Sequence, residues 1–375
     1  MSLLRSLIDN NIERACLNDI HNSKVFFKPK EHLDKQVSLK QVDAFNKCFE
    51  YINKCTLEGK YVIEQDYIKN MKLTNYTFQD KGKYIWIVDK CIIDENTNEP
   101  YKYATISLGN DKLISDFHTQ FIIWNVLQRV TCRNSTEFCR SFCYANRYRY
   151  EHDCSTRNVR LKNTIFSMLG NFSDIMIELI EFLNLKFGAN IIFRFHESGD
   201  VYSQLYFSKI KYIMNECKDI KFMWYSKSLF VLDEINELNK IENVSIRYSL
   251  DFSTPDNIVK RVIDLDSLNT VVMPVDSLGS HLIDDKTAAT YCNLQYNRGY
   301  REAISIEVEE SEKNLQDELL RQKIAGKTIK KKINELSKIV KDNKKKFING
   351  DVKCGSCLKC LNKNIKTISF CQHGR

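Results

Sequence analysis

The segment IIFRFHESGD, residues 191–200, decides the fold prediction, because a short apolar run passes directly into polar residues. An apolar run of this length, rich in β-branched and aromatic residues, predicts a buried strand. Similar runs recur along the chain, and longer stretches with helical periodicity separate them. The strand candidates are residues 121–126, 191–195, 221–225, 244–248 and 270–275, and the helix candidates are 158–186, 203–217, 229–240 and 256–265. This alternation predicts an α/β fold, either a partial parallel (βα) barrel or an open parallel sheet.

Polar side chains gather where these strands end. In α/β folds, functional groups lie beyond the carboxyl ends of the strands, and ordinary turns there do not need Arg, His or Lys. The candidate catalytic residues are His196, Glu197, Asp200 and Lys227, and the candidate cofactor-binding residues are Arg194 and Arg247.

Each of these residues also has a structural interpretation. His196 is either an acid–base group tuned by nearby carboxylates or a hydrogen-bonded scaffold group. Asp200 either caps a helix or marks a helix start that contacts an anion or ribose. Lys227 either holds a phosphate or lies on the surface. By strand alternation, Arg194 points away from its two phenylalanine neighbours, and a buried Arg there needs a carboxylate such as Glu197 or Asp251.

The composition is that of an ordinary globular protein. Of 375 residues, 43% are hydrophobic and 28% charged, which excludes a disordered or collagen-like chain. No window approaches 18 uninterrupted apolar residues, and the first residues lack the apolar stretch of a signal peptide. We therefore expect a cytoplasmic protein without a membrane partner.

The net charge of +8 is unevenly distributed. Residues 321–375 hold 16 Lys or Arg against three Asp or Glu, a local charge of +13, so the rest of the chain is slightly acidic. Residues 321–366 include two lysine triplets, 330–332 and 344–346. Because lysine clusters bind phosphates by counterion release, this segment predicts a nucleic-acid contact. The alternative is a solvated helix face, because the segment lacks interleaved aromatic residues.

The flanks of the α/β core differ from it in pattern. Residues 1–80 are expected to be mostly helical, with a capped start near Ser38, and residues 81–119 form a β-hairpin connector. The (βα) core then covers 120–300, a charged helical segment 301–346, and a metal-binding cysteine tail 347–375.

The cysteine tail carries the strongest local motif. Cys354, Cys357 and Cys360 have C-x2-C-x2-C spacing, which lets three thiolates converge on one iron–sulfur cluster, most simply a [4Fe-4S] cluster. Zinc is the alternative metal, and plain thiols are the third interpretation. In a reducing compartment, clustered cysteines bind metal or act in redox chemistry more often than they form disulfides.

A second cysteine group follows the first core strand. Cys139 and Cys143 have the C-x3-C spacing found in radical S-adenosylmethionine enzymes, but Asn146 stands where their third cysteine is needed, so we do not predict a radical enzyme. We expect the tail to fold back and share one metal site with this loop. Cys143 or Cys139 would then be the fourth ligand, with Cys132 and Cys371 as the next candidates.

The order of these motifs resembles the phage and plasmid "gene product eighty-eight" domain family. The resemblance rests on residues 131–145, 194–200, 224–228, 354–360 and 368–374, and it covers roughly residues 120–375. It implies a mobile-element setting and a shared cysteine site, and it does not imply an activity. The first 115 residues lie outside it.

Two functions follow as hypotheses. The first is an iron–sulfur α/β protein that acts on a nucleotide or nucleic acid. The second is a non-enzymatic nucleic-acid-binding protein of phage or plasmid DNA replication or copy-number control, with a structural metal. A zinc-stabilised interaction protein is a weaker third. The absence of a His-hydrophobe-His motif and of a G-x4-G-K-[ST] sequence argues against a rolling-circle nickase and a P-loop hydrolase.

Overall fold

The computed structural model describes residues 34–110, 113, 119–141, 143, 145, 154–188, 191–251, 253–272, 290–291, 358–365 and 367–369. The chain divides into two compact units, residues 1–246 and 247–375, and each is described by itself. The charged segment 301–346, both lysine triplets, Cys354 and Cys357 lie outside the described residues.

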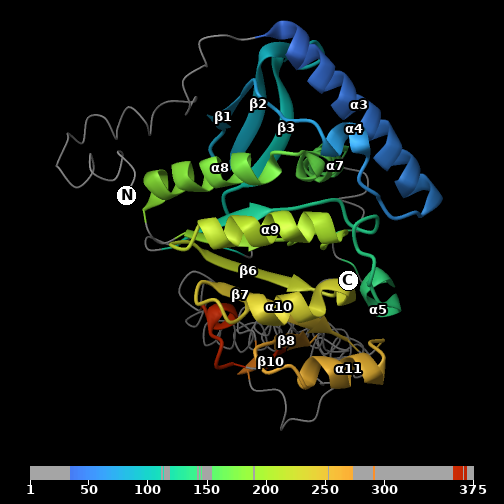
Figure 1. The fold of residues 1–375 in the computed structure, drawn as a ribbon, viewed down its shortest axis with the longest axis vertical. Helices are drawn as coiled ribbons and strands as arrows, with labels where there is room; N and C mark the ends of the chain where they lie inside the picture. The colour runs from blue at the N-terminus through green and yellow to red at the C-terminus, as the bar shows by residue number, and fades with distance from the viewer. Residues whose placement is uncertain are drawn as a thin grey trace, which may run out of the picture. The chain divides into compact units, whose positions relative to one another are not determined.

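The first unit begins with helix α3 (Lys35–Glu58), shown in Figure 1. Its N-cap is Asp34, whose Oδ1 accepts hydrogen bonds from the second and third residues of the helix. The predicted start at Ser38 is therefore wrong: Ser38 lies inside the helix, buried, and its Oγ accepts a hydrogen bond from Asn75 at 3.0 Å. The helix ends at Gly59 in the left-handed conformation.

Three antiparallel strands follow the short helix α4 (Asp66–Lys69). They are β1 (Tyr76–Asp80), β2 (Tyr84–Asp94) and β3 (Glu99–Ser107), and β2 pairs with both neighbours. The predicted hairpin is thus confirmed as β2 and β3. Strand β1 was not predicted, because its five residues fall within the region expected to be mostly helical.

The α/β part of the first unit contains strands β4 (Gln120–Trp124), β5 (Ile191–Phe195) and β6 (Lys221–Ser226), which pair in parallel. Strand β4 also pairs antiparallel with β3, so the strand order is β1-β2-β3-β4-β5-β6. The helices are α5 (Glu137–Ser141), α7 (Cys154–Met168), α8 (Phe172–Phe187), α9 (Gln204–Glu216), the 3₁₀ turn η2 (Leu229–Val231) and α10 (Leu232–Leu238). The strands predicted at 191–195, 221–225 and 244–248 are confirmed, and so is the strand predicted at 121–126, although it ends at Trp124. The strand predicted at 270–275 is confirmed over 270–272, and residues 273–275 lie outside the described residues. The single helix predicted over 158–186 is two helices.

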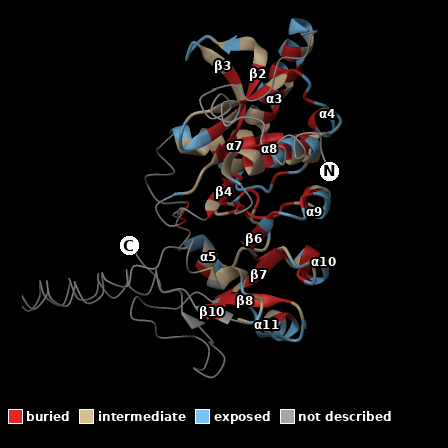
Figure 2. Cartoon of the chain, turned by 90° about the vertical axis from the view of Figure 1, so that its left-hand side faces the viewer, coloured by how far each residue is buried: buried red, intermediate tan, exposed pale blue. Residues whose placement is uncertain are grey.

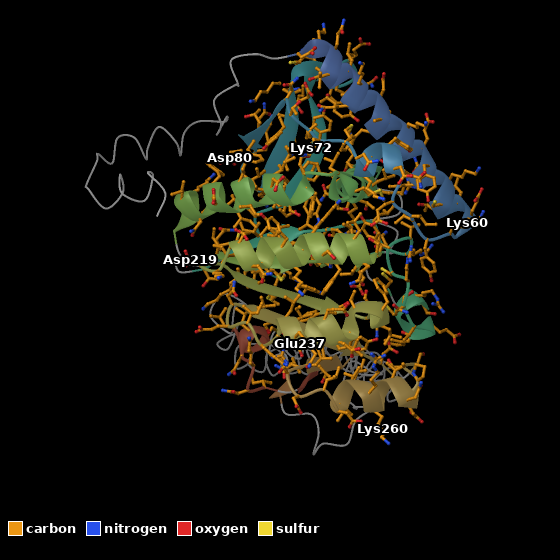
Figure 3. All side chains as sticks on the ribbon, in the orientation of Figure 1. Lys60, Lys72, Asp80, Asp219, Glu237 and Lys260 are labelled. Carbon is orange, nitrogen blue, oxygen red and sulfur yellow. The ribbon has the colours of Figure 1, made fainter. Side chains whose placement is uncertain are left out.

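Aromatic side chains fill the core between the sheet and the helices. Trp124 of β4 lies 5.6 Å from the Phe172 ring of α8, and the Phe172 ring lies 5.9 Å from Tyr206 of α9, with all three fully buried. Figure 2 shows buried residues along the strands and the inner helix faces. Charged side chains such as Lys60 and Glu237 are exposed instead (Figure 3).

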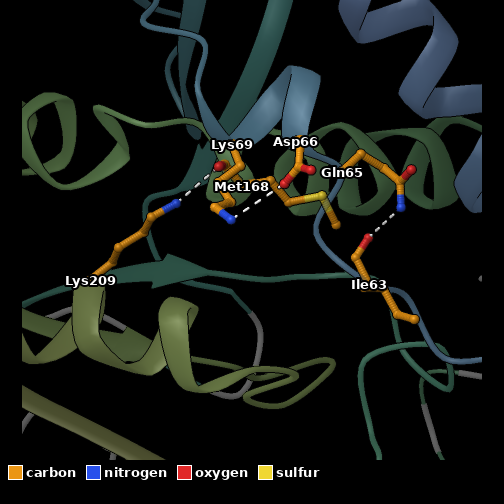
Figure 4. A network of polar contacts seen from close by, with 6 residues as sticks. All are labelled: Ile63, Gln65, Asp66, Lys69, Met168 and Lys209. Atoms are coloured by element: carbon orange, nitrogen blue, oxygen red, sulfur yellow. Dashed lines mark hydrogen bonds and ion pairs between the residues drawn. The ribbon is translucent and has the colours of Figure 1, made fainter.

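A half-buried lysine, Lys209, links α9 to the end of α7. Lys209 Nζ donates hydrogen bonds to the carbonyls of Ser167, Met168 and Leu169 at 3.1, 3.0 and 2.8 Å. Figure 4 shows the hydrogen bond to Met168. The last carbonyls of a helix have no partner within the helix, so the lysine satisfies them and favours the negative end of the helix dipole. Burial lowers the pKa of Lys209 to about 8.

The second unit consists of parallel strands in the order β7-β8-β10-β9. Its elements are β7 (Val244–Leu250, which begins in the last residues of the first unit), α11 (Asp256–Ile263), β8 (Asn269–Val272), β9 (Thr290–Tyr291), the 3₁₀ turn η3 (Lys359–Leu361) and β10 (Thr367–Ser369). The α/β fold class is therefore confirmed, with a mostly parallel sheet and an antiparallel part at β1–β4. The domain boundaries proposed from the sequence stay predictions.

None of the helices in the described ranges has the length and apolar character needed to cross a bilayer.

Candidate functional site

The loops after β4, β5 and β6 interlock at the carboxyl ends of these parallel strands. After β5, the Ser198 N–H donates to Asn125 Oδ1 at 2.8 Å, and the Val126 N–H donates to the Ser198 carbonyl at 3.2 Å. After β6, the Leu229 N–H donates to Asn134 Oδ1 at 3.0 Å. Because the loops satisfy one another's backbone groups, they form one fixed rim instead of three independent turns.

Gly199 is where the loops after β4 and β5 come closest. Its φ is +79°, in the left-handed region. A Cβ added here would lie 2.5 Å from Val126 Cγ2 and 2.8 Å from Thr131 Oγ1. The backbone conformation and the lack of space both require glycine.

Asp200 joins all three loops. It is 7% exposed, and its own N–H donates to Thr131 Oγ1 at 3.3 Å. Its Oδ1 accepts from Ser226 Oγ, and its Oδ2 accepts from the Lys227 N–H, both at 2.8 Å. Burial raises the pKa of Asp200, while these hydrogen bonds act in the opposite direction. The carboxylate therefore holds the loop after β6 in place.

His196 lies at the end of β5 with a φ of +55° and is 3% exposed. Its Nε2 is 2.9 Å from Tyr206 Oη, which also accepts from Trp124 Nε1 at 3.0 Å. Its Nδ1 has no hydrogen-bond partner among the described residues. Burial lowers the pKa of His196 to about 3, so the ring is neutral near pH 7. This geometry favours the scaffold interpretation of His196 over acid–base catalysis.

The other polar residues of the rim contact different partners. The Arg194 guanidinium lies 4.9 Å from the centroid of the Tyr225 ring, a cation–π contact. Glu197 accepts a hydrogen bond from Asn110 Nδ2 at 2.7 Å. Lys227 is 9% exposed, so a surface position for this residue does not fit.

Cys132, Cys139 and Cys143 are partly buried in the loop after β4. Burial raises the pKa of the Cys132 thiol, and charges on Asp200, Cys139 and Cys143 add to this effect. These four groups are thus close enough to interact electrostatically. Thiols are suitable donors for zinc or an iron–sulfur cluster. Within the described ranges, however, no three His, Cys, Asp or Glu side chains are arranged to hold a metal ion.

In the second unit, Arg247 of β7 binds the described part of the cysteine tail, residues 358–365. It is fully buried. Its Nε donates to the Cys360 carbonyl at 3.0 Å, and its two terminal nitrogens donate to the Ile365 carbonyl at 2.7 Å and the Asn362 carbonyl at 2.8 Å. Arg247 was expected to bind a cofactor, and the structure places it against the tail backbone.

The structure brings together only part of the predicted site. Asp200, Lys227 and the three loop cysteines gather at the rim of the first unit, whereas Cys360 lies in the second unit. Since Cys354 and Cys357 lie outside the described residues, the metal site shared between loop and tail stays a prediction.

Sequence reasoning missed the small polar residues that organise the rim. Thr131, Asn134 and Ser226 each bond to another loop, through the contacts with Asp200 and Leu229 given above. Their signal is weak but physical, since Ser, Thr and Asn near strand ends commonly bond backbone groups of loops.

A family model described as Gene product 88 matches residues 104–362. The chain belongs to the Gene product 88 family. The matched region starts within β3 and contains every predicted site residue, while the segment 368–374 lies beyond its end. No curated protein and no solved structure matches the chain.

Proposed function

We propose that this chain is an iron–sulfur protein of a phage or plasmid that acts on a nucleotide or nucleic acid. The observation that carries the proposal is the C-x2-C-x2-C motif of Cys354, Cys357 and Cys360, whose last cysteine lies in a segment bound by Arg247. Three thiolates at this spacing suit a [4Fe-4S] cluster, with zinc as the alternative metal.

The thiols of the loop after β4 support the proposal. A raised pKa keeps Cys132 protonated near neutral pH, which makes it a poor nucleophile. A metal ion overcomes this by displacing the proton, so ligation suits Cys132 better than nucleophilic catalysis. Cys143 or Cys139 would supply the fourth ligand. A bound cluster supplies electron transfer if the protein fills all four positions, or an open iron for substrate if it fills three.

The nucleotide or nucleic-acid part of the proposal is supported by charge and by the place of the rim. The rim lies at the carboxyl ends of parallel strands, where α/β proteins bind ligands. Residues 321–366 add a dense set of lysines that suits phosphate groups.

Metal analysis after anaerobic purification tests the cluster. We expect a brown protein with about four irons and four sulfides per chain. Replacing Cys357 and Cys360 together with serine should remove the iron, whereas Cys91→Ser, in β2 and outside both cysteine groups, should keep it. One zinc without colour would support the alternative metal, and a metal-free protein would overturn the proposal.

A second candidate function is favoured by the charge of +13 in residues 321–375. It is a non-enzymatic nucleic-acid-binding protein for phage or plasmid replication or copy-number control, with a structural metal. Its test replaces residues 330–332 and 344–346 with glutamine and measures DNA binding against salt concentration. Replacing the six exposed lysines Lys35, Lys40, Lys54, Lys60, Lys211 and Lys218 with glutamine is the charge-matched control.

If the tail substitutions alone abolish DNA binding and the replication phenotype, while Lys227→Met leaves both unchanged, this second function replaces the first. If Lys227→Met abolishes the phenotype while DNA binding persists, the first function stands.

A further inference from the structure

We propose that Arg247 is a positioning residue that docks the cysteine tail onto the sheet before metal binds, and so presents Cys360 as a ligand. The inference rests on the proposed function, because it assigns a role toward the metal. It concerns only residues of the second unit.

The contacts of Arg247 are directed at backbone atoms spread over the tail. Its three nitrogens donate to the carbonyls of Cys360, Asn362 and Ile365 at 2.7 to 3.0 Å, and a fourth contact reaches the Thr270 carbonyl of β8 at 3.5 Å. The planar guanidinium presents five N–H groups in fixed directions, so one side chain fixes the path of the segment. A lysine ammonium has fewer donors and no fixed plane.

Two further contacts anchor the same segment. Asn269 of β8 is 3% exposed, and its Nδ2 donates to the Lys363 carbonyl at 3.0 Å. Strand β10 then pairs in parallel with β8, with Thr367 opposite Thr270. The tail is thus bound to β7 and β8 by side-chain and backbone hydrogen bonds of the protein itself.

Backbone strain within the motif supports the same inference. Leu358, between Cys357 and Cys360, has a φ of +48° and is not a glycine. A non-glycine residue keeps such a conformation only where surrounding contacts impose it. The contacts of Arg247 begin two residues later, at the carbonyl of Cys360.

Docking by Arg247 also places a buried positive charge next to the backbone of a proposed cluster ligand, because the guanidinium bonds to the carbonyl of Cys360. Charge and hydrogen bonds around cluster ligands tune the reduction potential.

The test compares Arg247→Met, Arg247→Lys and Asn269→Ala with Arg261→Met, which removes an exposed arginine of α11 in the same unit. Hydrogen exchange of residues 358–369 is measured in metal-free full-length protein, and the metal content and reduction potential are measured after anaerobic reconstitution with iron and sulfide. Exchange in β7 and β8, which belong to the second unit, reports whether each variant is folded.

We expect Arg247→Met to increase tail exchange by about tenfold or more, since each tenfold change corresponds to the loss of roughly one charged hydrogen bond. It should also lower the iron content. Arg247→Lys and Asn269→Ala should give smaller increases in tail exchange. If Arg247→Met keeps some iron, its reduction potential should be lower than that of the wild type, because a positive charge near the cluster has been removed. Arg261→Met should resemble the wild type.

The outcomes separate the two proposals. If Arg247→Met does not fold, Arg247→Lys and Asn269→Ala decide by the same measurements. If the variants bind as much iron as the wild type with unchanged tail exchange, Arg247 is not a positioning residue, and the iron–sulfur proposal survives. If the wild type takes up neither iron nor zinc, the proposed function fails, and the ligand role of Cys360 fails with it even if the tail remains docked.

Discussion

Replacing Gly199 with alanine should destabilise the rim far more than the same change at another left-handed glycine. Gly199 has a φ of +79°, and its missing Cβ would lie 2.5 Å from Val126 Cγ2. Gly59 has a φ of +65°, yet a Cβ there would meet nothing within 4 Å. Gly59→Ala therefore carries the backbone strain alone, while Gly199→Ala adds a steric clash.

The magnitudes follow from these two terms. Left-handed strain in a non-glycine residue costs about 1 kcal/mol. Overpacking adds about 1 to 3 kcal/mol, and the clash with Thr131 Oγ1 also weakens the hydrogen bond from the Asp200 N–H. We expect a loss of roughly 1 kcal/mol for Gly59→Ala and roughly 3 kcal/mol for Gly199→Ala, out of a total of about 5 to 15 kcal/mol for a native protein.

Urea unfolding followed by far-ultraviolet circular dichroism measures the difference. With a denaturant slope of about 2 kcal/mol per molar urea, the midpoint should fall by roughly 0.5 M for Gly59→Ala and roughly 1.5 M for Gly199→Ala. Equal shifts in the two variants would refute the close approach between the loops after β4 and β5.

The remaining predictions concern buried titratable groups. The pKa of His196 is about 3 in the folded chain and 6.5 in the unfolded one, so the unfolded state binds more protons between these values and stability falls as pH drops from 6.5. Between pH 6 and pH 4, denaturant titrations should show the wild type losing about 1.4 kcal/mol per pH unit more than His196→Asn, and parallel curves would contradict this. Lys209→Met should lower the unfolding free energy by about 2 kcal/mol, because three carbonyls lose their donor, while the exposed control Lys240→Met should change it by less than about 0.5 kcal/mol. In metal-free protein at pH 8, iodoacetamide should alkylate Cys132 at least about tenfold more slowly than in urea-unfolded protein, because burial raises the pKa of its thiol. Mass spectrometry measures the two alkylation rates, and equal rates would contradict a buried environment for Cys132.

The parallel strands could be predicted because their signal is local. Strands β4, β5 and β6 are short runs of mostly apolar residues bounded by polar ones, and such a run reports burial directly. Strand β1 was missed because it lacks this local apolar signal. It has only five residues and two of them are buried, so its pairing with β2 decides its conformation.

The place of the candidate site could also be predicted, but not the role of each residue. Sequence position puts His196 and Asp200 at the carboxyl end of β5. Their chemistry depends on groups that other elements bring beside them, such as Tyr206 of α9 for the imidazole and Ser226 of β6 for the carboxylate. Burial turned a candidate acid–base histidine into a neutral scaffold group.

The amino-acid sequence by itself determined the alternation of strands and helices, the rim at which their polar ends meet, and the spacing of the tail thiols. Those properties need only neighbours along the chain, because apolar periodicity and ligand spacing are local. Only the tertiary structure decided that Gly199 has no room for a side chain, that Asp200 joins three loops, and that Arg247 binds the tail backbone. The physical reason is that a charged or polar group buried by folding must be satisfied by whatever the fold places beside it, and those partners lie up to 118 residues away.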